Sequence, residues 1–354
     1  MKILHLVEYL ELGGIERLLS TFSDYANDKA VFFAYEMDGP KGISLEMARK
    51  GRKVYFYKKQ AGHDGCVVKK LKKIIKEENI STIHTHDFGP MEYALRLKLL
   101  FPKIQLVHTQ HTLHHFLSNK KYTYFFQFAA LFYKKIVCVS ESVKKALQKK
   151  FVIPLRNLEV IYNGIALEKF PWNESVYFSN ILRLVGVSRI SAEKNLEHTI
   201  KSLYYLKQRG IEFEYRHIGS GEQEYEEKIK KSVTDLGLDQ NIKFLGHQEN
   251  VSPFLVDAQV FISSSFTEGH PISVVEALAS GLTCFLSDID PHAIFKNSNV
   301  HYFSLENGSM LVDLLSEYTE DSEKYGASLA RGRDFIKNYF SIETTLDEYM
   351  KIYR

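Results

Sequence analysis

The sequence predicts an α/β protein made of two doubly wound domains, each a parallel sheet with helices on both faces. Short apolar strands alternate with helical stretches along the chain, the pattern of parallel strands joined by crossover helices. The alternation runs through two series, and 354 residues are too many for one typical hydrophobic core. The turn signal Asn163–Gly164 separates the series.

Each expected strand is a short apolar run bounded by polar or glycine residues. The first series covers 2–7, 30–35, 53–57, 82–84, 105–108, 136–139 and 158–161, with helices expected at 14–25 and 66–78. The second series covers 181–187, 214–218, 242–245, 259–263, 283–286 and 300–303. We therefore expect an N-terminal domain at 1–165, a C-terminal domain at 166–334 and a helical, aromatic stretch at 335–354.

The composition is that of an ordinary globular protein. Three scattered cysteines, Cys66, Cys138 and Cys284, argue against a disulfide framework and for a reducing cytoplasm. The N-terminus enters an apolar strand without a signal-peptide pattern. No apolar run approaches the roughly 20 residues that span a bilayer. We expect a cytoplasmic protein.

Charge is distributed unevenly between the halves. Residues 1–165 hold 27 Lys and Arg against 15 Asp and Glu, whereas the remainder holds 19 against 28. Lysine doublets flank the aromatic segment 122–133, which suits an anionic membrane surface and a peripheral position on the inner face of the plasma membrane. A core helix with solvated lysines at its ends explains the same pattern. No arginine-rich or zinc-finger pattern accompanies the lysines, which argues against nucleic acid as a partner.

Two glutamates mark a candidate binding edge in the second series. Glu268 follows the strand at 259–263, and Glu276 lies about two turns into a helix expected to begin near Pro271 and to end at Gly281. The carboxyl ends of parallel strands are where ligands bind in open α/β sheets. Carboxylates accept hydrogen bonds from hydroxyl groups, so the pair fits a hydroxyl-rich ligand. A solvated helix position and a loop charge would give the same spacing.

Two cations follow the first strand of that series. Arg189 and Lys194 lie in the loop beyond residue 187, at the same expected sheet edge. Together they could neutralise a diphosphate, with Arg as a planar fork and Lys as a point charge. Surface charges without a ligand remain an equal alternative at this point.

Glycine loops follow a strand in each series. Gly13 and Gly14 precede the helix that carries Glu16, and Gly219 and Gly221 follow the strand at 214–218. Glycine lets a backbone approach a ligand closely, although a simple turn explains either loop. Neither loop is the full fingerprint of a dinucleotide-binding oxidoreductase.

Histidines cluster near strand ends in the first series, at 84, 86, 108, 111, 114 and 115. A zinc site is the alternative function for this cluster. However, the sequence has neither a His-Glu-x-x-His motif nor cysteines and histidines at the spacing of zinc ligands. We therefore expect no metal. A single histidine that acts on a sugar hydroxyl, His111, fits better.

The order of these motifs, with Val139–Ser140–Glu141 and Asn163–Gly164 between them, resembles the retaining nucleotide-sugar glycosyltransferases of family 4, of bacterial type, which have the GT-B fold. The resemblance covers nearly the whole chain and is most specific over 261–281. It departs at His270, where a bulky apolar residue is frequent, at Asn195, where glycine is common, and at Ala166, where an aspartate or a similar residue is frequent.

The resemblance implies two Rossmann-like domains that face each other across a cleft. The first would bind the acceptor, the second the nucleotide sugar, and the helix at 335–354 would cross back to the first domain. The reaction would move a sugar from a nucleoside diphosphate, UDP rather than GDP, to a hydroxyl of a lipid-linked or surface-polysaccharide glycan. The anomeric configuration would be kept. Neither a cofactor nor a metal would be needed.

The resemblance also implies roles for single residues. Catalytic roles fall on His111, near the anomeric carbon, on Arg189 and Lys194, at the departing diphosphate, and on Glu268, at the sugar hydroxyls. Nucleotide and donor binding fall on Gly13, Gly14, Gly219, Gly221, Gly269, His270, Pro271, Ile272, Ser273 and Glu276. Acceptor-side candidates are Glu16 and His86. Two alternatives stay open: an epimerase or hydrolase of nucleotide sugars on the same fold, and a non-catalytic sugar-nucleotide-binding scaffold.

Overall fold

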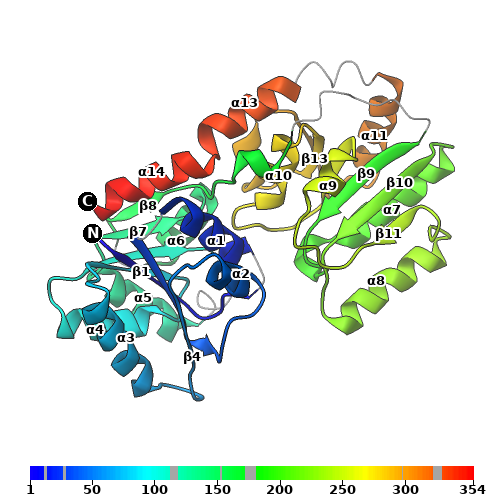
Figure 1. The fold of residues 1–354 in the computed structure, drawn as a ribbon. Coiled ribbons are helices and arrows are strands. Elements are labelled where there is room, and N and C mark those ends of the chain that lie inside the picture. The colour runs from blue at the N-terminus through cyan, green and yellow to red at the C-terminus, as the bar shows by residue number, and fades with distance from the viewer. Residues whose placement is uncertain are drawn as a thin grey trace. The chain divides into compact units, whose positions relative to one another are not determined.

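The computed structural model describes residues 1–11, 14–26, 29–111, 119–151, 154–171, 181–296, 298–321 and 329–354. They form two compact units, each built on its own sheet (Figure 1). Unit 1 consists of Met1–Gly164 with Ile342–Arg354, and unit 2 consists of Ile165–Ser341. The predicted α/β class with two parallel, helix-covered sheets is confirmed.

Unit 1 contains an eight-stranded sheet in the order β3-β4-β2-β1-β5-β6-β7-β8. Its strands are β1 (Ile3–Val7), β2 (Ala30–Ala34), β3 (Glu36–Met37), β4 (Val54–Lys58), β5 (Thr82–His86), β6 (Gln105–Gln110), β7 (Lys135–Cys138) and β8 (Leu158–Val160). All pairs are parallel except β3 with β4. The sequence did not predict β3, because two residues are too short to show a period.

Helices cover both faces of this sheet. They are α1 (Gly14–Ala26), α2 (Ile43–Arg49), α3 (Gly65–Glu77), α4 (Met91–Leu100), α5 (Lys120–Ala130), α6 (Glu141–Lys150) and α14 (Ile342–Tyr353). Among the described residues, three of these helices begin at side-chain caps: Asp64 accepts from the amide of Cys66, Asn119 from that of Lys121, and Ser140 from that of Val143.

The strands alternate between two cores. In β1, Leu4 and Leu6 belong to the core under α3 to α6, whereas Ile3 and Val7 belong to the core under α1, α2 and α14. His5 lies between Ile3 and Val7 on the strand, so the period of two places it on the α1 and α14 side. This alternation decides which histidines can meet.

Unit 2 contains a six-stranded, fully parallel sheet in the order β11-β10-β9-β12-β13-β14. Its strands are β9 (Leu182–Val187), β10 (Phe213–Ile218), β11 (Ile242–Phe244), β12 (Val260–Ser263), β13 (Thr283–Ser287) and β14 (Val300–Phe303). Its helices are α7 (Leu196–Gln208), α8 (Gln223–Asp235), α9 (Ser252–Val256), α10 (Ile272–Ala279), α11 (Met310–Glu320) and α13 (Leu329–Tyr339), with single 3-10 turns at η2 (Leu167–Lys169), η3 (Ala192–Lys194) and η4 (His292–Phe295).

The stretch expected as one helix at 335–354 is two helices. The chain leaves α13 at Phe340 and Ser341, where the amide of Ile165 donates to the carbonyl of Phe340 at 2.9 Å and Ile165 forms a parallel bridge with Ser341. These backbone groups are therefore not available to continue a helix. Residues 335–341 lie in unit 2, whereas α14 lies in unit 1, where Tyr349, Ile352 and Tyr353 are buried.

Candidate functional site

One predicted cation and one predicted carboxylate form an ion pair at the carboxyl edge of the unit 2 sheet. Lys194 follows β9, Glu268 follows β12, and these two strands are neighbours. Lys194 Nζ donates to Glu268 Oε2 at 2.6 Å, and the two side chains are only 16% and 11% exposed. The structure therefore brings together two of the four residues predicted to be catalytic.

A second contact fixes the Glu268 carboxylate. Ser265 Oγ donates to Glu268 Oε1 at 2.7 Å, and the carbonyl of Ser265 accepts from Ser287 Oγ at 2.6 Å. The imidazole of His292, whose pKa is lowered by burial, bonds through Nδ1 to the carbonyl of Ser287 at 2.8 Å. The sequence did not identify these residues in advance. The available signal was a run of three serines, 263–265, that begins at the last residue of β12.

Arg189 lies apart from this pair. Its guanidinium donates to Glu193 Oε1 at 3.2 Å, and its side chain is 74% exposed. In this arrangement Arg189 is a surface cation on the loop after β9. Its contact with Glu193 uses one guanidinium nitrogen, so other N–H donors of the group stay available to a ligand.

Asn195 explains one departure from the expected motif. Its backbone has φ 49° and ψ 47°, the left-handed region in which glycine is common and asparagine is the best-tolerated alternative. Ser264 Oγ donates to its carbonyl at 2.7 Å. The turn after Lys194 therefore keeps the shape that a glycine would give it.

The glycine loop after β10 meets the chain's own backbone. A Cβ at Gly219 would lie 1.9 Å from the carbonyl oxygen of Ser188, and one at Gly221 would lie 2.0 Å from that of Ile190. Residues 188–190 follow β9, which pairs with β10. The close approach at Gly219 and Gly221 thus serves the packing of two adjacent loops, whatever ligand binds nearby.

The segment from Gly269 to Glu276 leads into α10. Pro271 occupies the N-cap position, and the helix begins at Ile272 rather than at the proline. Gly269, Ile272 and Ser273 are half-buried. Glu276 is a buried carboxylate, 4% exposed, in the second turn of a mainly apolar helix. A buried acid on such a helix requires polar partners, so it is not a solvated helix position.

His270 is half-buried, and its ring stacks on Phe340 with centroids 5.6 Å apart. Burial lowers the pKa of His270 to about 3, so the ring is neutral. It therefore packs as a flat apolar group at a position where the resembled family often has a bulky apolar residue.

In unit 1, the predicted residues lie after β1, β5 and β6. Gly13 falls outside the described residues, and Gly14 is the exposed first residue of α1. Glu16, in the first turn of α1, is half-buried, and burial together with the charge of Asp87 raises its pKa to about 7. A carboxyl group with this pKa can exchange a proton near neutral pH.

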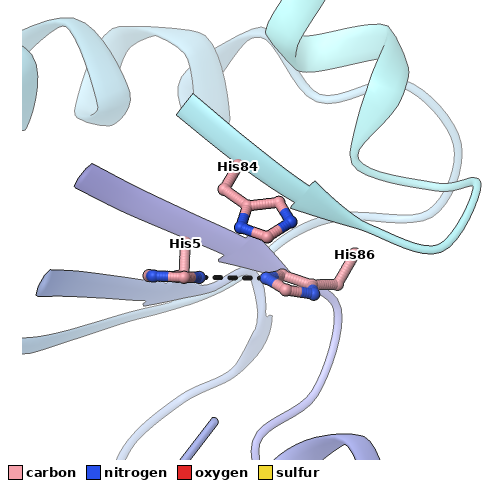
Figure 2. Close-up of side chains that lie close together, drawn as sticks. All are labelled: His5, His84 and His86. Carbon is pink, nitrogen blue, oxygen red and sulfur yellow. Dashed lines mark hydrogen bonds between the residues drawn. The ribbon is translucent and has the colours of Figure 1, made fainter. Parts of the chain in front are cut away.

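Four histidines of unit 1, at 5, 84, 86 and 111, form a buried array on the α1 and α14 side of the sheet. His5 Nδ1 bonds to His86 Nε2 at 3.0 Å, and His86 Nδ1 bonds to His111 Nε2 at 3.1 Å (Figure 2 shows His5 and His86). His111 is 5% exposed and directly follows β6. Two further histidines of the predicted cluster, 114 and 115, lie outside the described residues.

One ring nitrogen from each of His5, His84 and His86 lies within 4.8 Å of the other two, close enough in principle for a metal ion (Figure 2). Both nitrogens of His84 are already engaged, by Tyr353 Oη at 2.6 Å and by Thr109 Oγ1 at 2.7 Å. His5, which sequence analysis did not single out, pairs in register with His84 across β1 and β5. The only signal in the sequence was that His5 shares one face of its strand with Ile3 and Val7.

Among the described residues, no helix combines the length and the apolarity that crossing a membrane requires.

Comparisons with known proteins agree with this geometry. The model of Glycosyltransferase Family 4 matches residues 12–169, and the model of Glycosyl transferases group 1 matches residues 180–332. Each match covers most of one compact unit. The chain therefore belongs to the glycosyltransferases with the GT-B fold, built from one domain of each of these two families.

Two relatives and one solved structure show the extent of the similarity. The UDP-Gal:alpha-D-GlcNAc-diphosphoundecaprenol alpha-1,3-galactosyltransferase of Escherichia coli is 24% identical over 80% of this chain and 77% of its own length. The GDP-mannose:cellobiosyl-diphosphopolyprenol alpha-mannosyltransferase of Xanthomonas campestris is 28% identical over 61% of this chain and 58% of its own length. The crystal structure of Anabaena Alr3699/HepE in complex with UDP and glucose superposes with a TM-score of 0.84 at 18% identity, covering 99% of this chain and 98% of that one.

Proposed function

We propose that the protein transfers a sugar from a nucleoside diphosphate sugar to a hydroxyl group of an acceptor glycan and keeps the anomeric configuration. The observation that carries the proposal is the partly buried Lys194–Glu268 pair at the carboxyl edge of the unit 2 sheet, with the buried acid Glu276 on the helix that follows. A cation paired with one carboxylate, with a second carboxylate on the next helix, matches a ligand that has both phosphate and hydroxyl groups.

Each charge has a separate role in this proposal. Glu276 accepts hydrogen bonds from the ribose hydroxyls, and Glu268 accepts them from hydroxyls of the donor sugar. Lys194 uses one of its three N–H donors on Glu268 and keeps two for phosphate oxygens. Arg189 binds the diphosphate, where negative charge grows in the transition state. Because two cations supply this charge, we propose that no metal is required.

Retention follows from attack on the same face as the leaving group. An enzyme nucleophile would be a carboxylate free to bond the anomeric carbon. Both oxygens of Glu268 are engaged, by Ser265 and by Lys194, which suits a carboxylate that holds hydroxyl groups. We therefore propose that the leaving phosphate takes the acceptor's proton.

His111 and Glu16 are the unit 1 residues proposed to contact the substrates. We propose that the imidazole of His111 contacts a hydroxyl of the donor sugar. Glu16, with its pKa raised to about 7 by burial and by Asp87, is the acceptor-side candidate, and its carboxyl group would hydrogen-bond a hydroxyl of the acceptor.

The relatives bear on the donor and the acceptor. One relative is named for UDP-Gal and one for GDP-mannose, while the fold neighbour was solved with UDP. The UDP-Gal enzyme is similar over the longer part of this chain, so we propose a uridine nucleotide. Both relatives are named for acceptors on a polyprenyl diphosphate, and we propose a lipid-linked glycan as the acceptor here.

An anionic bilayer surface suits the exposed side of α5. Phe126, Ala129 and Ala130 are buried in the core, but Tyr124 is 59% exposed and Phe128 is 56% exposed. The exposed set continues with Tyr122, Leu131 and Phe132. Lys120, Lys121 and Lys134 are exposed around it. Exposed aromatic side chains with lysines beside them bind at the level of lipid headgroups. We therefore propose that the protein attaches to the membrane surface through these aromatic and lysine side chains.

Transfer is tested by incubating the protein with UDP- and GDP-sugars and a polyprenyl-diphosphate-linked acceptor, with and without EDTA. The proposal expects acceptor-dependent product whose anomeric proton coupling matches that of the donor, and no effect of EDTA. Donor consumption without acceptor would favour the hydrolase or epimerase. Nucleotide binding without any turnover would favour the scaffold.

A substitution tests the role of Arg189. Arg189→Ala should raise the activation free energy of transfer by about 2 kcal/mol or more. Unchanged turnover would remove Arg189 from the diphosphate site.

Membrane attachment is tested by sedimentation with vesicles of phosphatidylglycerol and phosphatidylcholine. The double variant Tyr124→Ser/Phe128→Ser should lose binding, and salt should weaken binding of the unaltered protein because the lysines contribute through screened attraction. Tyr205→Ser, at an exposed tyrosine of α7 in unit 2, is the matched control. Equal binding of all three proteins would overturn the proposal.

A further inference from the structure

Three imidazoles in unit 1 form one continuous hydrogen-bonded chain. His5 in β1 bonds to His86 in β5 at 3.0 Å (Figure 2). His86 in turn bonds to His111, after β6, at 3.1 Å. The first bond joins Nδ1 of His5 to Nε2 of His86, and the second joins Nδ1 of His86 to Nε2 of His111. Each bond thus joins a δ nitrogen to the ε nitrogen of the next ring.

All members of this chain are buried, and the two inner rings are neutral. Burial lowers the pKa of His5 to about 3 and holds that of His86 well below its ordinary value. A neutral imidazole has one N–H donor and one acceptor nitrogen. Because both nitrogens of His86 are bonded, one bond must use its proton and the other its lone pair.

When His111 is neutral as well, only two proton arrangements satisfy both bonds. In the first, all three rings carry the proton on Nε2, and in the second all three carry it on Nδ1. Any mixture places two N–H groups or two lone pairs face to face, which leaves buried polar atoms unsatisfied. The three tautomers are therefore coupled, and the second nitrogen of His111 is an acceptor in the first arrangement and a donor in the second.

The inner end of the chain is closed. His5 Nε2 has no hydrogen-bond partner within the described part of the protein. The ring stacks on Phe32 at 5.0 Å and meets Phe22 edge-on at 4.8 Å. A proton passed inward would produce a cation among aromatic rings in the core, so the chain does not conduct protons through the unit. It can only fix their placement.

A metal ion held by the three clustered rings would compete with existing hydrogen bonds. It could recruit His84 only by breaking a bond to Tyr353 or Thr109. His5 and His86 also lie nearly parallel, with 21° between their planes, whereas metal ligands converge on a point. The hydrogen-bonded chain is the better account of the cluster.

We propose that His5 and His86 are positioning residues that determine which ring nitrogen of His111 carries its proton, and thereby whether His111 accepts or donates a hydrogen bond at the sugar hydroxyl. The functional part rests on the role proposed above for His111. The coupling of the three tautomers does not. It follows from hydrogen bonds within unit 1 alone.

The direct test is nitrogen NMR of protein labelled with 15N-histidine at neutral pH. Long-range correlations within each ring identify the protonated nitrogen, and single substitutions assign the three rings. We expect one shared tautomer for His5, His86 and His111. Two different tautomers among them would overturn the proposal, and so would stoichiometric Zn²⁺ retained after dialysis that removes these ring signals.

A substitution tests the direction of control. In His5→Leu, His86 loses one partner, and the ring nitrogens of His111 should shift as its two tautomers become similar in energy. His108→Leu is the matched control, because His108 is equally buried but lies on the other side of the sheet, bonded to Thr85 and Gln110. Unchanged His111 signals in His5→Leu, or equal shifts in both variants, would overturn the proposal. The wild-type tautomers still decide it if neither variant folds.

The proposed transfer reaction and the proposed tautomer coupling can be refuted separately. If no nucleotide sugar is turned over, the proposed function fails, although the shared tautomer can still be present. If transfer occurs and the coupling is real, His5→Leu should lower kcat for transfer more than His108→Leu does, with similar KM for the donor in both. An identical kcat in the two variants would remove the functional part of the proposal.

Discussion

The Lys194–Glu268 pair gives the most quantitative prediction. Lys194→Met keeps the aliphatic stem and removes the charge, and Glu268→Gln keeps an oxygen that can accept from Ser265. The two single variants and the double variant form a cycle whose coupling energy isolates the pair. The exposed pair Arg189–Glu193, with side chains 74% and 34% exposed, provides a matched control.

The magnitude follows from distance and burial. Two unit charges about 4 Å apart attract by about 4 kcal/mol at an effective dielectric constant of about 20. Desolvation offsets part of this, so a charged hydrogen bond contributes about 1.5–3 kcal/mol net. With the 2.6 Å contact and side chains only 16% and 11% exposed, we expect a coupling energy of about 2 kcal/mol. The surface pair should give roughly 0.2–1 kcal/mol.

Urea unfolding of the four proteins, followed by a probe in unit 2, measures the coupling. A loss of about 2 kcal/mol should also lower the thermal midpoint by about 4–8 °C for a unit of this size. A coupling energy no larger than that of Arg189–Glu193 would refute the reasoning. It would mean that water screens Lys194 and Glu268 as it screens a surface pair.

Three further predictions concern the backbone and pH. Gly221→Ala should destabilise unit 2, because its Cβ would lie 2.0 Å from a carbonyl oxygen. Gly308→Ala should not, because nothing lies within 4 Å of the position of its Cβ. Equal unfolding midpoints for the two variants would contradict the close packing at Gly221. Asn195→Ala should cost about 1–2 kcal/mol and Asn195→Gly much less, because φ is 49°; urea unfolding that ranks them the other way would contradict this. Burial lowers the pKa of folded His5 to about 3 and that of folded His108 to about 4. The free energy of unfolding should therefore decrease as the pH falls from about 6.5 toward those values, because the unfolded chain binds more protons. The expected slope is about 1.4 kcal/mol per pH unit for each histidine. Acid titration of unfolding by circular dichroism checks the slope, which should be shallower in His5→Leu.

Much of the fold could be predicted, because each strand of a parallel sheet is marked by a short apolar run in the local sequence. Every expected strand is present, with ends displaced by no more than two residues. The break at Phe340 and Ser341 could not be predicted, because it depends on backbone bonds to Ile165, far away in the sequence. The helical period on both sides of it is uninterrupted in the sequence.

The candidate site divides in the same way. Glu268 and Lys194 could be placed at one edge because both follow neighbouring parallel strands. Arg189 follows the same strand as Lys194, yet its side chain bonds to Glu193 at the surface. Loop position predicts an edge of the sheet. It does not predict the direction of a long side chain, which depends on the nearest partner.

The sequence by itself determined the α/β class, the two sheets, and the residues gathered at the carboxyl edge of unit 2, because hydrophobic period and chain order are local properties. Only the tertiary structure decided that Gly219 and Gly221 face the loop after β9, and that His5 joins His86 and His111. Those contacts depend on which strands are neighbours and which face each residue takes. Both are settled when the sheet assembles.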